Sequence, residues 1–249
     1  MSALLELSHV AKRFGGVHAV EDVSFSVEPN ELVGLIGPNG AGKTTIFNLI
    51  SGATAPTTGE IYHRGMRISR MGSTRIARRG IARTFQNIRL FRSLTVLDHV
   101  LVAQTCRSGG SLSQLLPTRA HAPATQQARE LLEIVGLGRR CDQLARYLPY
   151  GEQRRLEIAR ALATSPDLIL LDEPAAGLNE AETAELRALL KDLRSRGHTI
   201  LLVEHDMKVV LLVCSRVLVL VFGRLIACGT PAEIRSNPEV INAYLGSAA

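Results

Sequence analysis

The sequence predicts an α/β fold, and three observations support this prediction. Short apolar runs alternate with segments of helical spacing, most regularly after Pro166. A glycine-rich loop, GPNGAGKTT at 37–45, lies between an apolar run and a helical segment. A second apolar run, DLILLDE at 167–173, ends in two adjacent carboxylates. Such a run suits a buried parallel strand that delivers the acids to the edge of a sheet.

The first part of the chain, residues 1 to about 85, is predicted to be rich in strands. Glycine and proline turns join its apolar or alternating runs, and its helical interruption, TTIFNLI, directly follows the glycine-rich loop. At 249 residues the chain can bury a large core, as one large domain or as a core with a lobe. The predicted strands cover 4–10, 17–28, 31–37 and 59–65.

From about Gln86 to Ala163 the pattern becomes helical. Residues 95–104 and 126–137 have helical spacing, and a basic helix at 153–162 follows the glycine-bearing turn LPYGE. Between the first two helices, residues 106–124 are rich in Ser, Gly and Pro. We expect this segment to be a mobile loop inserted at the tip of a lobe.

After Pro166, strands and helices are predicted to alternate. A helix over 180–196 has Leu186, Leu189, Leu190 and Leu193 on one face, and Asn179 with Glu182 predicts its N-terminal cap. The remaining elements are strands at 167–173 and 199–205, a helix at 207–214, and two strands within 216–229.

The glycine-rich loop has the pattern of a phosphate-binding loop. Its glycines allow a tight turn in which successive amides converge on phosphate oxygens at the positive end of the following helix. Lys43 would reach the β- and γ-phosphates, Thr44 would bind Mg²⁺, and Thr45 would contact the α-phosphate. A glycine turn with an unrelated lysine is the alternative, which the flanking strand and helix disfavour. The other ATP-binding candidates are Gly37, Pro38, Asn39, Gly40, Ala41 and Gly42.

The net charge of +6 and the pI near 9.5 would suit nucleic acid, anionic lipid or phosphate ligands. Many arginines lie in the middle of the sequence and not in a basic tail, only 4% of the residues are aromatic, and tryptophan is absent. This composition favours a solvated or ligand-facing basic surface over a stripe that binds nucleic acid.

The four cysteines, Cys106, Cys141, Cys214 and Cys228, are far apart and form no CxxC pair. They indicate neither a zinc site nor a redox motif, and we expect reduced core thiols in a cytosolic protein. The N-terminus lacks a signal-peptide pattern, and the most apolar tract, 209–222, is too short and too interrupted for a membrane span. We therefore expect that the chain does not cross a bilayer by itself.

Taken in order, the motifs resemble those of the ATP-binding subunit of an ABC transporter, over nearly the whole chain. They are GPNGAGKTT, RTFQ, LPYGEQRR, LILLDEP, AGLN and VEHD. The resemblance implies a P-loop NTPase core of ABC ATPase type, with an N-terminal antiparallel β subdomain and an inserted α-helical lobe. It predicts one ABC ATPase domain over 1–249, with 1–85 and 164–249 as the nucleotide-binding core and 86–163 as the lobe.

A finer likeness is to the subunit that serves branched-chain amino acid uptake. It rests on RTFQNIRLFRSLTVLDHVLVAQ, LPYGEQRRLEIARAL, LDEPAAGLN, LLVEHDMKVV and EIRSNPEVINAYLG. Importers of amides, urea or other hydrophobic amino acids remain alternatives, because the solute pocket would belong to other chains. Two further alternatives are a soluble ABC ATPase of repair or translation and a regulatory module that holds ATP without useful hydrolysis.

The resemblance also implies roles for individual residues. Phe14 would stack on adenine, and a core phenylalanine is its alternative. Asp172 would hold Mg²⁺, directly or through water, and Glu173 would be the general base for the attacking water. A helix cap is the alternative for this acidic pair, since Pro174 follows.

Gln86 and His205 would complete the hydrolytic site. The Gln86 amide would contact Mg²⁺ or the lytic water and move with the helical lobe. A surface glutamine is the alternative. His205 would sense the γ-phosphate through a hydrogen bond, and the other histidines are expected to be ordinary surface or core residues.

The turn LPYGE would form a second anion-binding corner, which closes over ATP on a neighbouring subunit through Gly151 and Glu152. Here Pro149 and Tyr150 replace the serine and first glycine that are usual in this motif, so a hydroxyl contact is lost. Asn179 stands where the family often has aspartate.

The implied protein is an ATPase at the cytoplasmic face of the inner membrane, with ATP and Mg²⁺ as cofactors. It would pair head to tail with a second, non-identical ABC ATPase subunit or with itself. Two membrane permease subunits and, indirectly, a solute-binding protein are its further expected partners, and nucleic acid is not expected.

Overall fold

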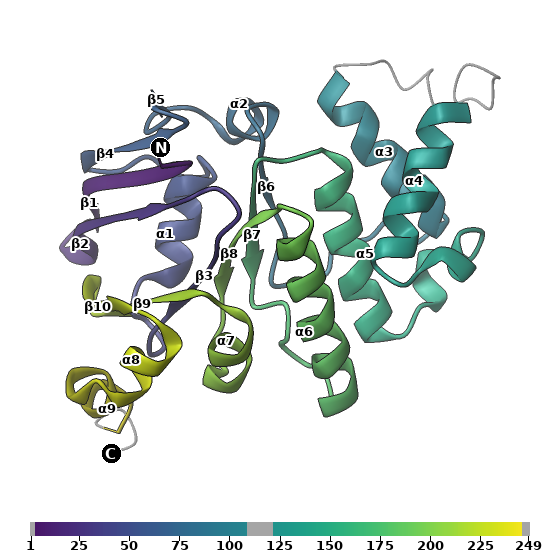
Figure 1. Cartoon of the computed structure of the whole chain (residues 1–249). Coiled ribbons are helices and arrows are strands. Elements are labelled where there is room, and N and C mark those ends of the chain that lie inside the picture. Colours follow the sequence, from purple (N-terminus) through teal and green to yellow (C-terminus); the bar gives the residue numbers. More distant parts are fainter. Residues whose placement is uncertain (1–2, 109–121, 246–249) are drawn as a thin grey trace.

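The computed structural model describes residues 3–108 and 122–245, which contain two β-sheets (Figure 1). The four-stranded sheet, in the order β2-β1-β4-β5, is antiparallel throughout. The six-stranded sheet, in the order β10-β9-β3-β8-β7-β6, is parallel apart from the β9–β10 pair. The α/β class and the antiparallel subdomain are therefore confirmed. The strands are β1 (Leu5–Phe14), β2 (Val17–Val27), β3 (Leu32–Ile36), β4 (Thr58–His63), β5 (Met66–Arg67), β6 (Ile81–Arg83), β7 (Leu168–Asp172), β8 (Thr199–Val203), β9 (Arg216–Val221) and β10 (Arg224–Gly229).

The parallel strands β3, β6, β7 and β8 direct their carboxyl ends to one edge of the larger sheet. In the register, Leu35 of β3 and Asp172 of β7 both lie opposite Val203 of β8. The segments that follow these strands carry the glycine-rich loop and the predicted catalytic side chains. This edge is where an open α/β sheet binds its ligands.

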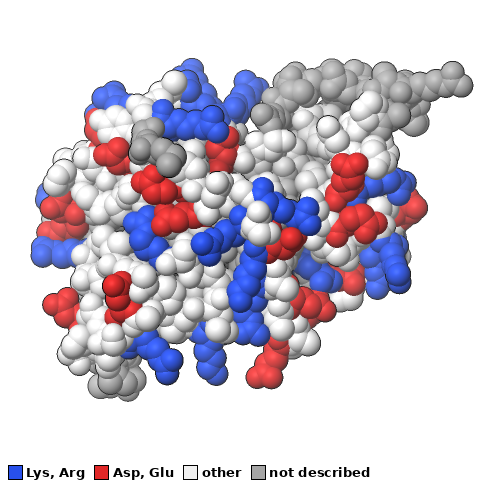
Figure 2. Space-filling model, viewed as in Figure 1, with Lys and Arg blue, Asp and Glu red and all other residues white. Residues whose placement is uncertain are grey.

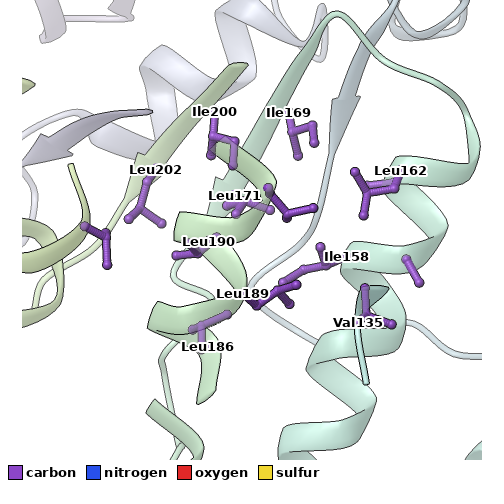
Figure 3. Packing of buried hydrophobic residues seen from close by; sticks show 14 of the residues in the cluster. Val135, Ile158, Leu162, Ile169, Leu171, Leu186, Leu189, Leu190, Ile200 and Leu202 are labelled. Carbon is purple, nitrogen blue, oxygen red and sulfur yellow. The ribbon is translucent and has the colours of Figure 1, made fainter. Parts of the chain in front are cut away.

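Both faces of the larger sheet are buried, as the apolar character of its strands predicts. Alternate side chains of β3, β7, β8 and β9 enter two separate hydrophobic clusters. One cluster contains the predicted leucine face of α6, together with α5 (Figure 3). The other lies between the two sheets and contains Ile46, Phe47, Leu49 and Ile50 of α1.

The helices of the described residues mostly match the predicted segments. The predicted N-terminal cap of α6 is confirmed, since the Asn179 side chain accepts from the Glu182 amide at 2.9 Å and the Asn179 amide donates to the Glu182 carboxylate at 3.0 Å. The α-helices are α1 (Lys43–Ile50), α2 (Ser73–Arg78), α3 (Val96–Ser108), α4 (Ala122–Ile134), α5 (Tyr150–Ala163), α6 (Glu180–Ser195), α7 (Met207–Val213), α8 (Pro231–Ser236) and α9 (Pro238–Leu245).

Helices α3, α4 and α5 pack against one another beside the β6 edge of the sheet (Figure 1). Basic and acidic side chains are interspersed over the face of the molecule seen in that view (Figure 2). The predicted loop at 106–124 is too long at both ends, because residues 106–108 belong to α3 and residues 122–124 to α4. Residues 109–121 lie outside the described part of the chain. The short helix α2 was not predicted, since it buries a single apolar side chain, Ile76, and has no side-chain cap.

The cysteines depart from expectation at one position. Cys141 and Cys214 are buried free thiols, but Cys228 is exposed because it lies on the edge strand β10. The expectation of a core thiol is therefore wrong for Cys228. The side chain of Cys106 is not among those that the structure describes. Within residues 3–108 and 122–245, no helix is long and apolar enough to cross a membrane.

Candidate nucleotide-binding and hydrolysis site

The glycine-rich loop leaves β3 at Gly37 and enters α1 at Lys43. Glycine is required at both of its ends by close main-chain contacts. A Cβ atom on Gly37 would lie 2.0 Å from the Leu220 carbonyl oxygen. One on Gly42, whose φ is 104°, would lie 2.4 Å from the Ala19 carbonyl oxygen. The loop is thus held tightly by neighbouring strands at the N-terminal end of α1, which is a suitable geometry for binding anions.

Lys43 is buried within this loop. Its Nζ donates to the carbonyl oxygens of Gly37 at 2.5 Å and Pro38 at 3.0 Å. Burial lowers the pKa of Lys43, whereas the charges of Glu173 and Asp172 oppose that shift. The ammonium group therefore lies between the loop and the acidic edge of the sheet. Thr44, which follows, is exposed, and Thr45 is half-buried.

Asp172 is the last residue of β7, and it is buried. One of its carboxylate oxygens accepts from Nη2 of Arg83 at 2.8 Å, and Arg83 also donates to the Asn48 side chain at 2.7 Å. The sequence reasoning missed Arg83, although its place three residues before Gln86 was a usable signal. Because Asn179 caps the following helix, the alternative that Asp172 and its neighbour form a helix cap is excluded.

Glu173 brings together the three predicted catalytic side chains. Gln86 Nε2 donates to its Oε2 at 2.7 Å, and His205 Nδ1 lies 3.9 Å from the same oxygen. The Glu173 amide donates to the Val203 carbonyl at 2.9 Å, and its φ of 47° is in the left-handed region. Such a conformation is costly for glutamate and is typical of functional sites. Gln86 is exposed, but its amide contacts an acid, so it is more than a solvated surface residue.

Glu204 is a second residue that the sequence reasoning missed. Its side chain is fully buried, and Oε1 accepts from the Ala175 amide at 2.7 Å. Its Oε2 lies 3.9 Å from Nδ1 of His205. Burial raises the pKa of Glu204 to about 7. Its position directly after the buried strand TILLV, next to His205, was the available signal.

Phe14 ends β1 and is 51% exposed, so the alternative of a core phenylalanine is wrong. Lys12 Nζ lies 4.9 Å from the centroid of its ring. The neighbouring strand β2 borders the glycine-rich loop, since the Ala19 carbonyl faces Gly42. An exposed ring at the end of a strand that pairs with β2 suits the predicted stacking on adenine.

The second anion-binding corner is built separately, at the start of α5. Pro149 occupies the N-cap position without a side-chain cap, so the first amides of the helix lack intrahelical partners. Gly151 is buried against α6, where a Cβ atom would lie 2.7 Å from a Glu182 carboxylate oxygen. The Glu152 carboxylate is 3.4 Å from Nε of Arg140. A cavity of about 200 Å³ at this corner is lined by α5 and α6 and by no residue of the glycine-rich loop.

The described residues contain no cluster of three or more His, Cys, Asp or Glu side chains that could hold a metal alone. The predicted ligands of Mg²⁺ are instead the Thr44 hydroxyl, the Asp172 carboxylate and the Gln86 amide oxygen. These are hard oxygen donors, and Mg²⁺ commonly takes few protein ligands beside phosphates and water. The donor set therefore fits Mg²⁺ that arrives with a nucleotide.

A phosphate loop after β3, paired acids at the end of β7 and a histidine after β8 define a P-loop ATPase. Residues 20–176 match the family described as ABC transporter, and residues 224–249 match the family described as branched-chain amino acid ATP-binding cassette transporter. The chain belongs to the family of ABC transporter ATP-binding subunits, and it is an ATPase coupled to transport.

Several known proteins resemble the chain over almost its full length. The high-affinity branched-chain amino acid transport ATP-binding protein LivG of Escherichia coli (strain K12) is 48% identical, and BraF of Pseudomonas aeruginosa is 46% identical, each over 98% of both chains. The lipopolysaccharide export system ATP-binding protein LptB of Haemophilus influenzae is 37% identical over 98% of both chains. The ADP conformation of MJ1267, an ATP-binding cassette of an ABC transporter, superposes with a TM-score of 0.88, at 30% identity and over 99% of this chain and 100% of that chain.

Proposed function

We propose that this chain hydrolyses ATP to power the import of branched-chain or other hydrophobic amino acids through membrane permeases. The observation that carries this proposal is the 48% identity to LivG over 98% of both chains, together with the match of residues 224–249 to the branched-chain family. The lower identity to LptB, which is named for lipopolysaccharide export, supports the choice of solute.

In the proposed reaction, the glycine-rich loop and Lys43 bind the phosphates, and Phe14 stacks on the adenine. Mg²⁺, when bound by Thr44, Asp172 and Gln86, would neutralise charge on the phosphates.

Glu173 orients the attacking water and takes its proton. The hydrogen bond from Gln86 fixes the Glu173 carboxylate, and His205 lies within reach of the same oxygen. These residues position the water and stabilise charge, which is most of what phosphoryl transfer requires.

The second anion-binding corner belongs to a neighbouring ATPase site in this proposal. Gly151, Glu152 and the start of α5 close over ATP bound to a second ABC ATPase, which pairs head to tail with this chain. The resemblance to the branched-chain system favours a non-identical subunit, and pairing with itself is the alternative. The separation of this corner from the lining of the glycine-rich loop supports a contact across subunits.

A large cavity beside Gln86 suits the permease. Its volume is about 900 Å³, and it lies between β6, the segment that follows it, α3 and α5. Phe85 and Phe91 are 42% and 54% exposed in its wall, beside Arg89. The charged residues of its lining are mostly basic, namely Arg83, Arg89 and Arg160 beside a single acid, Glu157. We therefore propose that this cavity accepts a permease segment with an apolar face and acidic flanks. The chain would then lie at the cytoplasmic face of the membrane, indirectly linked to a solute-binding protein.

Co-purification from solubilised membranes tests this assignment. The tagged wild-type chain should retain permeases and a second ATPase, whereas Phe91→Glu should lose the permeases but still bind ATP. Ribosomes or DNA in place of permeases would contradict a transport function. If cells that carry the chain took up amides or urea but not leucine, the transported solute would be an amide or urea instead of a branched-chain amino acid.

A further inference from the structure

Tyr150 marks the place where this chain departs from the usual signature motif, and its side chain connects the two anion-binding corners. A glycine, the usual residue there, has no side chain with which to make such a connection. The phenol oxygen of Tyr150 accepts from Nη2 of Arg154 at 2.9 Å. The Arg154 guanidinium also lies over the Tyr150 ring, 5.4 Å from its centroid.

Arg154 in turn holds the segment that carries Gln86. It is only 3% exposed, and its Nη2 donates to the Gln86 carbonyl at 2.5 Å. Its Nη1 donates to the Phe85 carbonyl at 3.0 Å. A buried guanidinium with several acceptors is fixed in one orientation, because breaking any of these bonds leaves a charge-assisted partner unsatisfied.

Glu157, one turn further along α5, supports this arrangement. Its Oε2 lies 3.3 Å from Nη1 of Arg154, and its Oε1 accepts from the Arg89 amide at 3.0 Å. The segment from Phe85 to Arg89 is therefore attached to α5 at both ends. We therefore expect a movement at the start of α5, which includes Tyr150, to displace the main chain of Gln86.

Tyr150 also contacts the loop that follows the acidic pair. A Cβ atom on Gly177 would lie 3.1 Å from Cε1 of the Tyr150 ring. The Ala175 amide, in the same loop, is bonded to Glu204 next to His205. Tyr150 thus lies between the corner that faces the partner's ATP and two segments of this chain's own hydrolytic site.

We propose that Tyr150, acting through Arg154, is a positioning residue that transmits closure of the partner's ATP site to Gln86 in this chain's own site. The inference rests on the proposed head-to-tail pairing. When the partner's ATP closes against the start of α5, Tyr150 and Arg154 fix the main chain of Gln86, so that its side chain stays bonded to Glu173. Hydrolysis here is then linked to occupancy of the other site.

The test measures ATP hydrolysis by the assembled transporter. Tyr150→Phe retains the ring but removes the hydroxyl that Arg154 contacts. It should lower kcat about three- to tenfold, as expected for one lost hydrogen bond, with the KM for ATP unchanged. Tyr147→Phe is the matched control, because the Tyr147 hydroxyl also accepts from an arginine, Arg146, at 3.0 Å, but on the exposed surface. This control should hydrolyse ATP at the wild-type rate.

A double-mutant cycle with Gln86→Ala separates this role from a structural one. If Tyr150 acts through Gln86, the double variant is no slower than Gln86→Ala alone. Equal kcat values for Tyr150→Phe and wild type, or additive losses in the cycle, would overturn the proposal. Because the readout is hydrolysis, these outcomes do not depend on which solute is transported.

Discussion

The fully buried carboxyl of Glu204 gives the protein a specific dependence of stability on pH. Its pKa is raised from an ordinary 4.5 to about 7, chiefly by burial, and the amide of Ala175 and the charge of His205 oppose this shift. The folded protein therefore holds a proton on Glu204 that the unfolded chain releases. Stability from this group is fully present below about pH 4.5 and is lost as the pH rises towards about 7.

Glu204→Gln mimics the protonated carboxyl and keeps an oxygen for the Ala175 amide. A pKa rise from 4.5 to about 7 corresponds to a loss of about 3 kcal/mol in the free energy of unfolding, which the variant should avoid. Urea unfolding of the nucleotide-free protein should show equal stability at about pH 4.5 and a more stable variant above about pH 7. A constant difference at all pH values, or a less stable variant at the upper pH, would refute this reasoning.

Three other substitutions test separate parts of the site and fold. Lys43→Ala should weaken nucleotide binding, because it removes the cation inside the loop. If titration with a fluorescent nucleotide gave the wild-type affinity for ATP, the loop would not be the phosphate-binding site. Phe14→Ala should weaken binding of adenine nucleotides while Phe14→Tyr does not, and equal affinities in the same titration would remove the stacking role. Asn179→Ala should lower the free energy of unfolding by about 1 kcal/mol, since it removes the cap of α6, and no shift in the denaturation midpoint would argue against that cap.

The elements that the sequence predicted well are those with strong local signals. The leucine face of α6 and its Asn179 cap follow from spacing alone, and the three five-residue strands β3, β7 and β8 are wholly buried runs. The convergence of Gln86, Glu173 and His205 was also predictable, because each follows a parallel strand.

The residues that were missed depend on contacts between distant segments. Arg83 binds Asp172, which is far along the chain, because the pairing of β6 with β7 brings the two residues together. Tyr244 of α9 packs against the core. Burial raises the pKa of Tyr244 to about 12, and a hydrogen bond with the main chain of Gly37 opposes this rise. The sequence near Gln86 could indicate that Arg83 belongs to the site, but it could not identify Asp172 as its partner, because such pairings are set by tertiary packing.

The proposed mechanism requires hydrolysis at Glu173 for the uptake of branched-chain amino acids. Its most direct test is the uptake of labelled leucine by cells in which the only copy of this chain is wild type or Glu173→Gln. Under this mechanism the variant should bind ATP, remain with its permeases and stabilise the closed pair of ATPases, while leucine uptake falls to that of cells without the chain. Leucine uptake at the wild-type rate by the Glu173→Gln cells would contradict it.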